Sequence, residues 1–442
     1  MSSFTSWAFR PLLDGAYEDK LDFVREQTIL KKGAFYFDWT ASGLASRIIE
    51  SRVLEILPYY ANTHSTSAKH AMLIQSLYEE SKRQIRQSLG LSENFVVLAC
   101  GSGATGAIKK FQELLGIYLP PESRKVVEIK QDSLPLVVVG AFEHHSNEVS
   151  FREGLCEVFR IPLKENLEFD LEACERVLEA NRHRKIILSY SLLSNVTGNL
   201  APFNELAALG RKYGCDIALD MASSSPDFQL LDCDSFDACF LSPHKLLGGV
   251  GSSGLLCIRK SLIDTRQSPT FAGGGVVFYV DRQTQIYRLD EELREEAGTP
   301  PILQVFRAAL AYRLRDEMGL EWIRQRKHTL MRIFLKSLKQ IPEVKIYGSE
   351  QHLGIVSFNI AGLSPFKLSY LLSTNYNIQT RAGCSCAGPY GHDLLGLEDG
   401  VYRGEEDPYG WLRVSLHYTH SREDIEYFFG ALGELVGILK PL

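Results

Sequence analysis

Ser242-Pro243-His244-Lys245-Leu246-Leu247-Gly248-Gly249 is the stretch that decides the fold and the chemistry of this chain. The apolar run before it predicts a buried strand, and the glycines after it predict a turn. A lysine at the end of such a strand can hold an aldehyde ligand as a Schiff base. Because a surface lysine in a turn is the ordinary alternative, the rest of the chain has to decide between the two.

Composition narrows the class of protein. The chain has 442 residues, so we expect two or three units, and its 45% hydrophobic and 23% charged residues are ordinary for a globular protein. A net charge of −6 argues against nucleic acid as a partner. No apolar run is long enough to predict a membrane span, and Met1–Arg10 lacks the pattern of a secretory signal. The nine cysteines lie mostly in apolar runs, which is typical of reduced thiols in the cytoplasm.

Short β-branched runs alternate with helical patterns from Phe95 onward. This alternation predicts an α/β fold with a mostly parallel sheet covered on both faces. The expected strands are 95–100, 136–140, 186–190, 216–220, 238–241 and 254–259, and the expected helices are 105–119, 169–181 and 203–213.

The pattern changes near Glu296-Ala297-Gly298-Thr299-Pro300-Pro301. Two long helices, 302–318 and 320–341, are followed by sparser strands and helices, which predicts a smaller α+β domain. We therefore expect a large ligand-binding domain over 36–295 and a small C-terminal domain over 296–442. Residues 1–35 are expected to pack with the small domain.

Gly101-Ser102-Gly103-Ala104-Thr105-Gly106 follows a predicted strand and opens a predicted helix. Small residues and free N–H groups at a helix start favour a phosphate. The same spacing fits the G-x-G-x-x-G loop of dinucleotide-binding folds, so an NAD-dependent oxidoreductase is an alternative. A tight turn without a ligand is the structural alternative.

Glu143-His144-His145-Ser146-Asn147 comes after another predicted strand. An imidazole at the end of a strand can lie flat against an aromatic ring or move protons near neutral pH. A solvated pair of histidines in a loop is the simpler alternative. We expect no metal site here, because nothing at helical spacing completes a ligand set.

Asp220 ends the apolar strand Ile217-Ala218-Leu219, and Ser223 follows closely. A buried carboxylate can keep a pyridine nitrogen protonated, which makes the ring an electron sink. Pyridoxal 5′-phosphate (PLP) is favoured by four features together: the phosphate loop, an imidazole that can lie flat against a ring, this carboxylate and Lys245. Ser223 can reach the ring hydroxyl of PLP. A turn-capping aspartate is the alternative.

Two further stretches carry candidate substrate contacts. Asn195, in Ser194-Asn195-Val196-Thr197-Gly198, can reach a ring oxygen or the substrate. In 411–417, alternation predicts Arg413 on the polar face of a half-buried strand, where it can hold a carboxylate with two hydrogen bonds. A simple turn and a solvated arginine are the respective alternatives.

Arg381-Ala382-Gly383-Cys384-Ser385-Cys386-Ala387-Gly388-Pro389 contains the two thiols that do not sit in an apolar run. An arginine and flexible glycines beside a cysteine suit a reactive thiolate on a mobile loop. A metal site with His392 is a weaker alternative because no second cysteine pair supports it. Two inert loop thiols are also possible.

Taken together, these motifs resemble the fold-type I PLP enzymes of aminotransferase class V, nearest to the group II cysteine desulfurases and selenocysteine lyases. The resemblance spans roughly residues 36–420 and also includes Gly273-Gly274-Gly275. It implies a seven-stranded sheet in the large domain, a homodimer and an amino-acid substrate, with a sulfur-acceptor protein as a possible partner.

By position, the resemblance also implies roles for individual residues. Lys245 would carry the cofactor and move the α-proton, and Cys386 stands at the position of the persulfide-forming cysteine. Arg413, with Asn195 and Arg381, would bind the substrate. The implied cofactor contacts are Ala104, Thr105, His144, Asn195, Asp220, Ser223, Ser242, His244, Lys245 and Gly275, the last reaching towards the neighbouring subunit's phosphate.

This sequence departs from the family pattern at several positions. Ser223 stands where the desulfurases typically have glutamine, Ala104 replaces a usual threonine, and Cys384 and Ser385 stand where histidines are typical. These changes leave the lysine and aspartate intact, so the sequence predicts a cysteine desulfurase or selenocysteine lyase that releases alanine. A class V aminotransferase or C–S lyase that does not use the cysteine is the alternative, and a non-catalytic binding module is a third.

Overall fold

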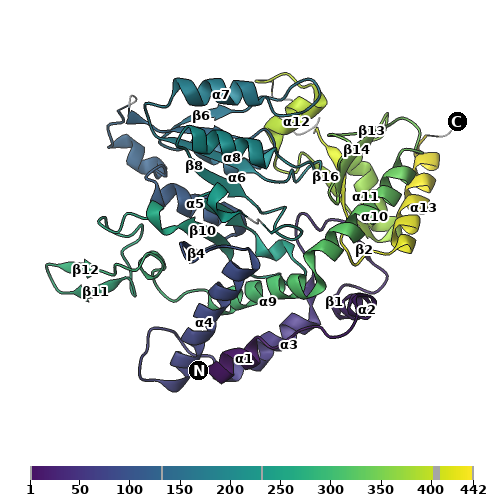
Figure 1. The fold of residues 1–442 in the computed structure, drawn as a ribbon. Coiled ribbons are helices and arrows are strands. Elements are labelled where there is room, and N and C mark those ends of the chain that lie inside the picture. Colours follow the sequence, from purple (N-terminus) through teal and green to yellow (C-terminus); the bar gives the residue numbers. More distant parts are fainter. Residues whose placement is uncertain (1, 131–132, 230–231, 402–408, 441–442) are drawn as a thin grey trace.

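The computed structural model describes residues 2–130, 133–229, 232–401 and 409–440. Figure 1 shows a large sheet flanked by helices and, beside it, a smaller unit formed by the C-terminal part of the chain. Within the described residues, no helix is long and apolar enough to cross a membrane.

The large sheet has seven strands in the order β4-β10-β9-β8-β7-β5-β6. Strand β10 pairs antiparallel with both β4 and β9, and all other neighbours are parallel. Because parallel strands end at the same edge of a sheet, the residues that follow them gather there. The strands are β4 (Phe95–Gly101), β5 (Leu136–Val139), β6 (Glu157–Arg160), β7 (Ile186–Ser191), β8 (Asp216–Asp220), β9 (Ala238–Leu241) and β10 (Gly254–Arg259).

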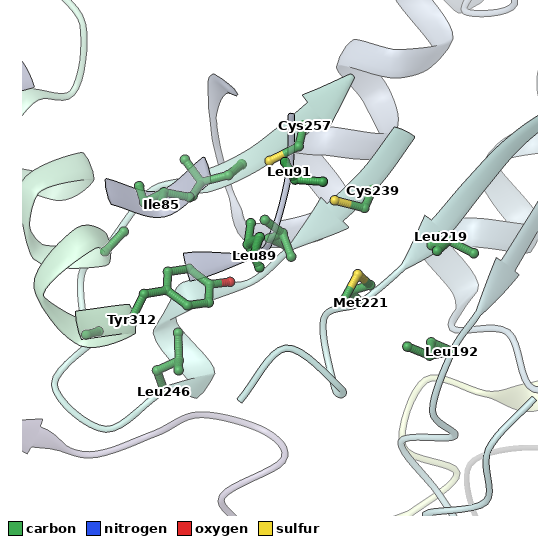
Figure 2. Packing of buried hydrophobic residues seen from close by; sticks show 14 of the residues in the cluster. Ile85, Leu89, Leu91, Leu192, Leu219, Met221, Cys239, Leu246, Cys257 and Tyr312 are labelled. Carbon is green, nitrogen blue, oxygen red and sulfur yellow. The ribbon is translucent and has the colours of Figure 1, made fainter. Parts of the chain in front are cut away.

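Helices cover both faces of this sheet because alternate strand residues point to opposite sides. On one face, apolar side chains pack against α5 (Gly103–Leu114) and α6 (His145–Arg152). On the other, they pack against α4 (Lys69–Ser88), α7 (Leu171–Ala180), α8 (Phe203–Lys212) and α9 (Ile302–Met318). Figure 2 shows part of this second core, where the cross-strand pair Cys239 and Cys257 faces Leu89.

The smaller unit is an antiparallel sheet in the order β13-β14-β17-β16. Its apolar core lies between this sheet and three helices, α10, α11 and α13. The elements are α10 (Leu320–Leu338), β13 (Val344–Ile346), β14 (Ile355–Ile360), α11 (Pro365–Tyr376), β15 (Ile378–Gln379), β16 (Arg381–Gly383), α12 (Gly388–Leu395), β17 (Trp411–Ser415) and α13 (Arg422–Leu439).

The N-terminal segment contacts both units. The apolar side chains of α1 (Ser2–Ala8) and α2 (Tyr17–Gln27) lie mostly in the core that contains α9, as does α3 (Arg47–Ile56). In contrast, Arg25 donates to the carbonyls of Thr419 and His420, and β2 (Phe35–Tyr36) pairs with β15. The division at residues 35 and 295 therefore stays a prediction, and α9 packs with the large sheet although it follows the predicted boundary.

A two-stranded hairpin, β11 (Val277–Val280) and β12 (Gln285–Tyr287), extends from the body at the lower left of Figure 1. A further short pair joins β1 (Thr28–Ile29) to β3 (Ala45–Ser46). The sequence patterns missed the hairpin strands, together with α1, α6, β6, β16 and α12.

The predicted fold class is confirmed in its main features. The helix expected over 302–318 and the strands over 216–220, 238–241 and 254–259 have the predicted bounds. Asp170 caps α7, accepting a hydrogen bond from the N–H of Ala173 at 2.9 Å. Strongly periodic segments are where the pattern fixes both the type and the ends of an element.

Candidate active site

One solvent-open cavity lies where the carboxyl ends of the large sheet's strands face the C-terminal unit. This is the usual position of ligand sites in open α/β sheets. The structure brings twelve sequence-predicted residues together in its lining: Ala104, Thr105, His144, Asn195, Asp220, Ser223, Ser242, His244, Lys245, Arg381, Cys386 and Arg413.

Lys245 lies in the part of the lining that the large sheet supplies, which we call the floor. It belongs to a single helical turn directly after β9. Its Nζ donates a hydrogen bond to Ser223 Oγ at 3.2 Å. Burial lowers the pKa of Lys245 to about 8, although the nearby Asp220 carboxylate opposes this shift. About a tenth of this amine is therefore uncharged at pH 7, and the uncharged form is the nucleophile towards an aldehyde.

Asp220 ends the neighbouring strand β8 and is only 6% exposed. Its Oδ1 accepts a hydrogen bond from the N–H of Ala222 at 2.8 Å. Burial raises the pKa of Asp220, and the positive charge of Lys245 acts in the other direction. A cationic ring nitrogen against this carboxylate would compensate the burial cost.

The loop from β4 to α5 forms a cradle at one end of the cavity. Gly103 has φ +62°, and a Cβ on it would lie 2.8 Å from His244 Cε1 and 3.0 Å from Ser242 Oγ. The N–H of Ala104 donates to Ser242 Oγ at 2.9 Å, and Thr105 Oγ1 shares a hydrogen bond with Ser146 Oγ at 2.7 Å. Hydroxyls and a helix N-terminus converge here, so the donor set fits a phosphate group.

The same loop does not form a dinucleotide-binding unit. In that fold, the glycine loop joins two parallel strands that pair through a βαβ crossover. Here β4 lies at the edge of the sheet and pairs with the antiparallel β10, while the next strand, β5, lies five strands away in the sheet order. The NAD-dependent alternative is therefore wrong for the described topology.

His144 is the N-cap of α6, where the sequence patterns gave only a loop. Its Nδ1 accepts a hydrogen bond from the N–H of Ser146 at 3.1 Å. Burial, followed by the charge of Lys245, lowers the pKa of His144 to about 4, so the ring is neutral near pH 7. Glu143 stabilises this turn. Its carboxylate accepts hydrogen bonds from Asn147 Nδ2 and from the backbone N–H and the hydroxyl of Ser191.

Arg413 and Arg381 belong to the part of the lining that the C-terminal unit supplies, which we call the wall. They face each other in the β16–β17 pairing, and Arg413 is only 2% exposed. Contrary to the expectation of a half-buried strand, all five residues of β17 are buried, because the strand is central in its sheet. The two guanidinium groups make this wall positively charged, as a carboxylate ligand requires.

Asp38 holds Arg413 in place and was missed by the sequence patterns. Arg413 Nη2 donates to Asp38 Oδ1 at 2.7 Å, and its Nη1 donates to the carbonyl of Asn195 at 2.9 Å. Arg413 Nε has no hydrogen-bond partner among the described residues. Asp38 could have been found by the reasoning used for Asp220, since it closely follows the apolar strand β2.

Cys386 lies in a tight turn on the same wall. The N–H of Ala387 donates to the carbonyl of Cys384 at 3.1 Å and closes the turn. Ser385 and Cys386 have φ of +54° and +56°, a left-handed conformation that costs about 1–3 kcal/mol per residue without glycine. The surrounding contacts must therefore hold this shape.

Four hydrogen bonds anchor the Cys386 turn. Asn195 Nδ2 donates to Ser385 O at 2.8 Å, and Trp411 Nε1 donates to Ser385 Oγ at 3.3 Å. The N–H of His145 donates to Cys386 O at 2.8 Å, while His145 Nε2 accepts from the N–H of Gly388 at 2.9 Å. The turn is thus fastened to the large domain, where the sequence predicts a mobile loop.

One expected residue, Gly275, lies outside this cavity, and the weaker alternative of a metal site also remains to be considered. Gly275 lies beside His64, in a different hollow that also contains Arg288 and Glu296. Across the part of the chain that the structure describes, no group of three metal-ligating side chains includes the two thiols and His392.

Comparison with known proteins shows the family to which the chain is similar. The model of the aminotransferase class-V family matches residues 35–428. A cysteine desulfurase of Salmonella agona is 30% identical over 263 residues, which cover 57% of this chain and 62% of that protein. A probable cysteine desulfurase of Pyrococcus abyssi is 26% identical over 94% of this chain and 98% of that protein.

Solved structures agree with the fold. The chain is similar to the apo structure of a cysteine desulfurase from Thermococcus onnurineus NA1, with a TM-score of 0.78, 26% identity and coverage of 94% of this chain and 98% of that one. The cysteine desulfurase CsdA from Escherichia coli has a TM-score of 0.77, with 97% and 100% covered, and its 20% identity speaks for the fold alone.

Proposed function

The chain belongs to the aminotransferase class-V family, and from that membership we propose that it is a PLP-dependent cysteine desulfurase. Cysteine would be converted to alanine, with the sulfur left as a persulfide on Cys386. The observation that carries this proposal is that Cys386 and Lys245 line the same cavity.

The residues present fit PLP. Lys245 would hold its aldehyde, Asp220 its pyridine nitrogen, and the cradle of Ala104, Thr105, Ser242 and His244 its phosphate. The neutral ring of His144 would lie against the pyridine ring, with Ser223 and Asn195 near its hydroxyl. When bound, PLP supplies an aldehyde for the substrate amine and a ring that stabilises negative charge at the substrate Cα.

The positively charged wall would orient the amino acid. Arg413 would bind the α-carboxylate, because its unpaired Nε and buried guanidinium favour an anion. Asp38 fixes the plane of that guanidinium, and Arg381 adds a second, more exposed charge. This orientation would direct the substrate sulfur towards Cys386 on the same wall.

Proton and sulfur transfer would then use two residues. Lys245 would take the proton from the substrate Cα, and the Cys386 thiolate would attack the substrate sulfur. The Cβ–S bond breaks, its electron pair stays with carbon, and that carbon takes up a proton. In balance, cysteine and the Cys386 thiol give alanine and the Cys386 persulfide.

The test compares alanine and sulfide release by the parent enzyme and by Cys386→Ala. We expect a loss of about 10²-fold or more in Cys386→Ala, because nucleophilic catalysis is removed. The half-buried Cys156, outside the cavity, provides the matched control Cys156→Ser, with activity near that of the parent. Undiminished release by Cys386→Ala would instead favour a class-V aminotransferase or a C–S lyase that does not use the cysteine. Selenocysteine is a second substrate to be tried in the same assay.

We propose a homodimer in the cytoplasm, with a sulfur-acceptor protein as partner. The exposed hairpin supports self-association, since Phe278 is 80% exposed on it. Gly275, at the base of the hairpin, would then lie by the other subunit's phosphate. The nine free thiols suit a reducing compartment. Light scattering of the parent and of Phe278→Asp tests the association, with the variant expected to shift towards the monomer.

A further inference from the structure

Cys384, two residues before Cys386, is a second thiol in the turn that carries Cys386. We infer that Cys384 is a relay residue, which receives the sulfur atom from the Cys386 persulfide and presents it to the acceptor. This inference rests on the proposed desulfurase function and deepens it, because it names the group through which the sulfur leaves the site.

The turn keeps the backbones of the two cysteines close together, so that rotation of the side chains can bring the thiols towards each other. Cys384 accepts the hydrogen bond that closes the turn, and Ser385 and Cys386 have consecutive left-handed conformations. A chain that curls about as tightly as a helix puts the Cα atoms of residues i and i+2, here Cys384 and Cys386, roughly 5.4 Å apart, with the two side chains starting on different sides of the turn. That separation is within the range of about 4.4–6.8 Å over which two cysteines can form a sulfur–sulfur bond.

A persulfide shortens the remaining gap. Its outer sulfur lies about 2.05 Å beyond Cys386 Sγ, the length of a sulfur–sulfur bond. The Cys384 thiol therefore does not need to approach Cys386 Sγ itself. The turn is anchored by Asn195, His145 and Trp411, so transfer can proceed by side-chain rotation while the backbone stays in place.

The two thiols differ in what they face. Cys386 lines the cavity with Lys245, whereas the described residues that line this cavity do not include Cys384. Cys384 lies near Tyr409 instead, whose pKa is raised by burial and then by the Cys384 thiol. A persulfide left on Cys386 would occupy the space that the next cysteine molecule must enter. Moving the sulfur to Cys384 would clear the cavity.

The transfer needs no external oxidant or reductant. The Cys384 thiolate attacks the outer sulfur of the Cys386 persulfide, a Cys384 sulfur–sulfur bond forms, and the bond to Cys386 Sγ breaks. Cys386 leaves as a thiolate and is ready for another turnover. The transferred sulfur atom keeps the oxidation state that it gained when the Cβ–S bond of the substrate broke.

The test is a burst measurement on the PLP-loaded enzyme with cysteine and no sulfur acceptor. With two thiols to fill, we expect about two alanines per subunit for the parent and about one for Cys384→Ser. After alkylation, fragment masses should map the persulfide to both cysteines in the parent and to Cys386 in Cys384→Ser. Cys156→Ser should behave like the parent.

The outcomes separate the relay from the proposed function. A parent burst of about one, with persulfide confined to Cys386, would overturn the relay and leave the desulfurase intact. A Cys384–Cys386 disulfide formed with release of sulfide would also overturn the relay, because the inner sulfur would then be the one attacked. Absence of both alanine and persulfide from the parent would instead sink the desulfurase proposal. The parent measurement needs no variant, so a folding defect in Cys384→Ser cannot blur the answer.

Discussion

The floor and the wall of the cavity are built differently. On the floor, Asp220 and Lys245 come from neighbouring strand ends of one buried sheet, so their spacing follows from the sheet itself. On the wall, Arg413 and Cys386 come from the C-terminal unit and are tied to the large domain by individual hydrogen bonds such as Asn195 to Ser385. On the floor, Lys245 and Asp220 match the class-V pattern that the sequence resembles although Ser223 departs from it, whereas the turn on the wall departs at both Cys384 and Ser385. This contrast indicates that the floor governs cofactor chemistry and the wall governs what happens to the substrate.

The largest expected effect is on the floor. Lys245→Ala should lower alanine formation by about 10²–10⁴-fold, because it removes the group that we propose moves the α-proton. Lys109→Ala, on the exposed face of α5, is the control and should keep the parent rate. If Lys245→Ala retained more than a tenth of the activity, the floor would not be where the chemistry starts.

The pH dependence of cofactor uptake tests the floor without a mutation. Burial lowers the pKa of Lys245 to about 8, and only the uncharged amine reacts with an aldehyde. The rate of PLP uptake by the apo-protein should therefore rise about 50-fold from pH 6 to pH 8 and level off above that. Stopped-flow absorbance measures it. A rate that continued to climb tenfold per unit to pH 10 would mean an amine with its ordinary pKa.

A wall variant should affect substrate and leave the cofactor alone. Arg413→Lys keeps the charge but loses the paired geometry towards Asp38 and a carboxylate, so KM for cysteine should rise about tenfold. The affinity for PLP should stay within twofold of the parent. Arg422→Lys on exposed α13 is the control. Equal losses in the affinities for PLP and for cysteine would contradict the division of roles between the floor and the wall.

The smallest effect separates backbone strain from crowding in the phosphate cradle. Gly103 and Gly116 both have positive φ, but a Cβ meets His244 and Ser242 at Gly103 and has nothing within 4 Å at Gly116. Both alanine variants should lose about 1 kcal/mol of stability from strain. Only Gly103→Ala should also weaken PLP binding, by severalfold in a fluorescence titration. Equal PLP affinities for the two variants would show that the phosphate does not bind in this cradle.

Much of the floor could be predicted from the sequence. Asp220 and Lys245 end clearly patterned strands, and parallel strands bring such residues to one edge, so their meeting follows from the fold class. The class-V resemblance read from the motifs is confirmed by the family match over 35–428. The element types are reliable wherever burial imposes a strong period, as in the helix over 302–318.

The wall was harder to predict for physical reasons. The residue pair Asp38–Arg413 joins positions 375 apart in the chain, a contact that no local pattern encodes. The Cys386 turn has two non-glycine residues at positive φ, which local propensity disfavours and tertiary contacts impose. The eight-residue α6 gives no helical signal in the sequence, because its first turn, His145-Ser146-Asn147, is polar and its cap is a histidine.

The most direct measurement concerns Lys245 itself. The purified protein, loaded with PLP, should be yellow, and borohydride should abolish the absorbance band by fixing the cofactor covalently. Peptide mass mapping should then find the reduced cofactor on Lys245. A protein that takes up no PLP, or a label on another lysine such as Lys327, would contradict the account at its centre.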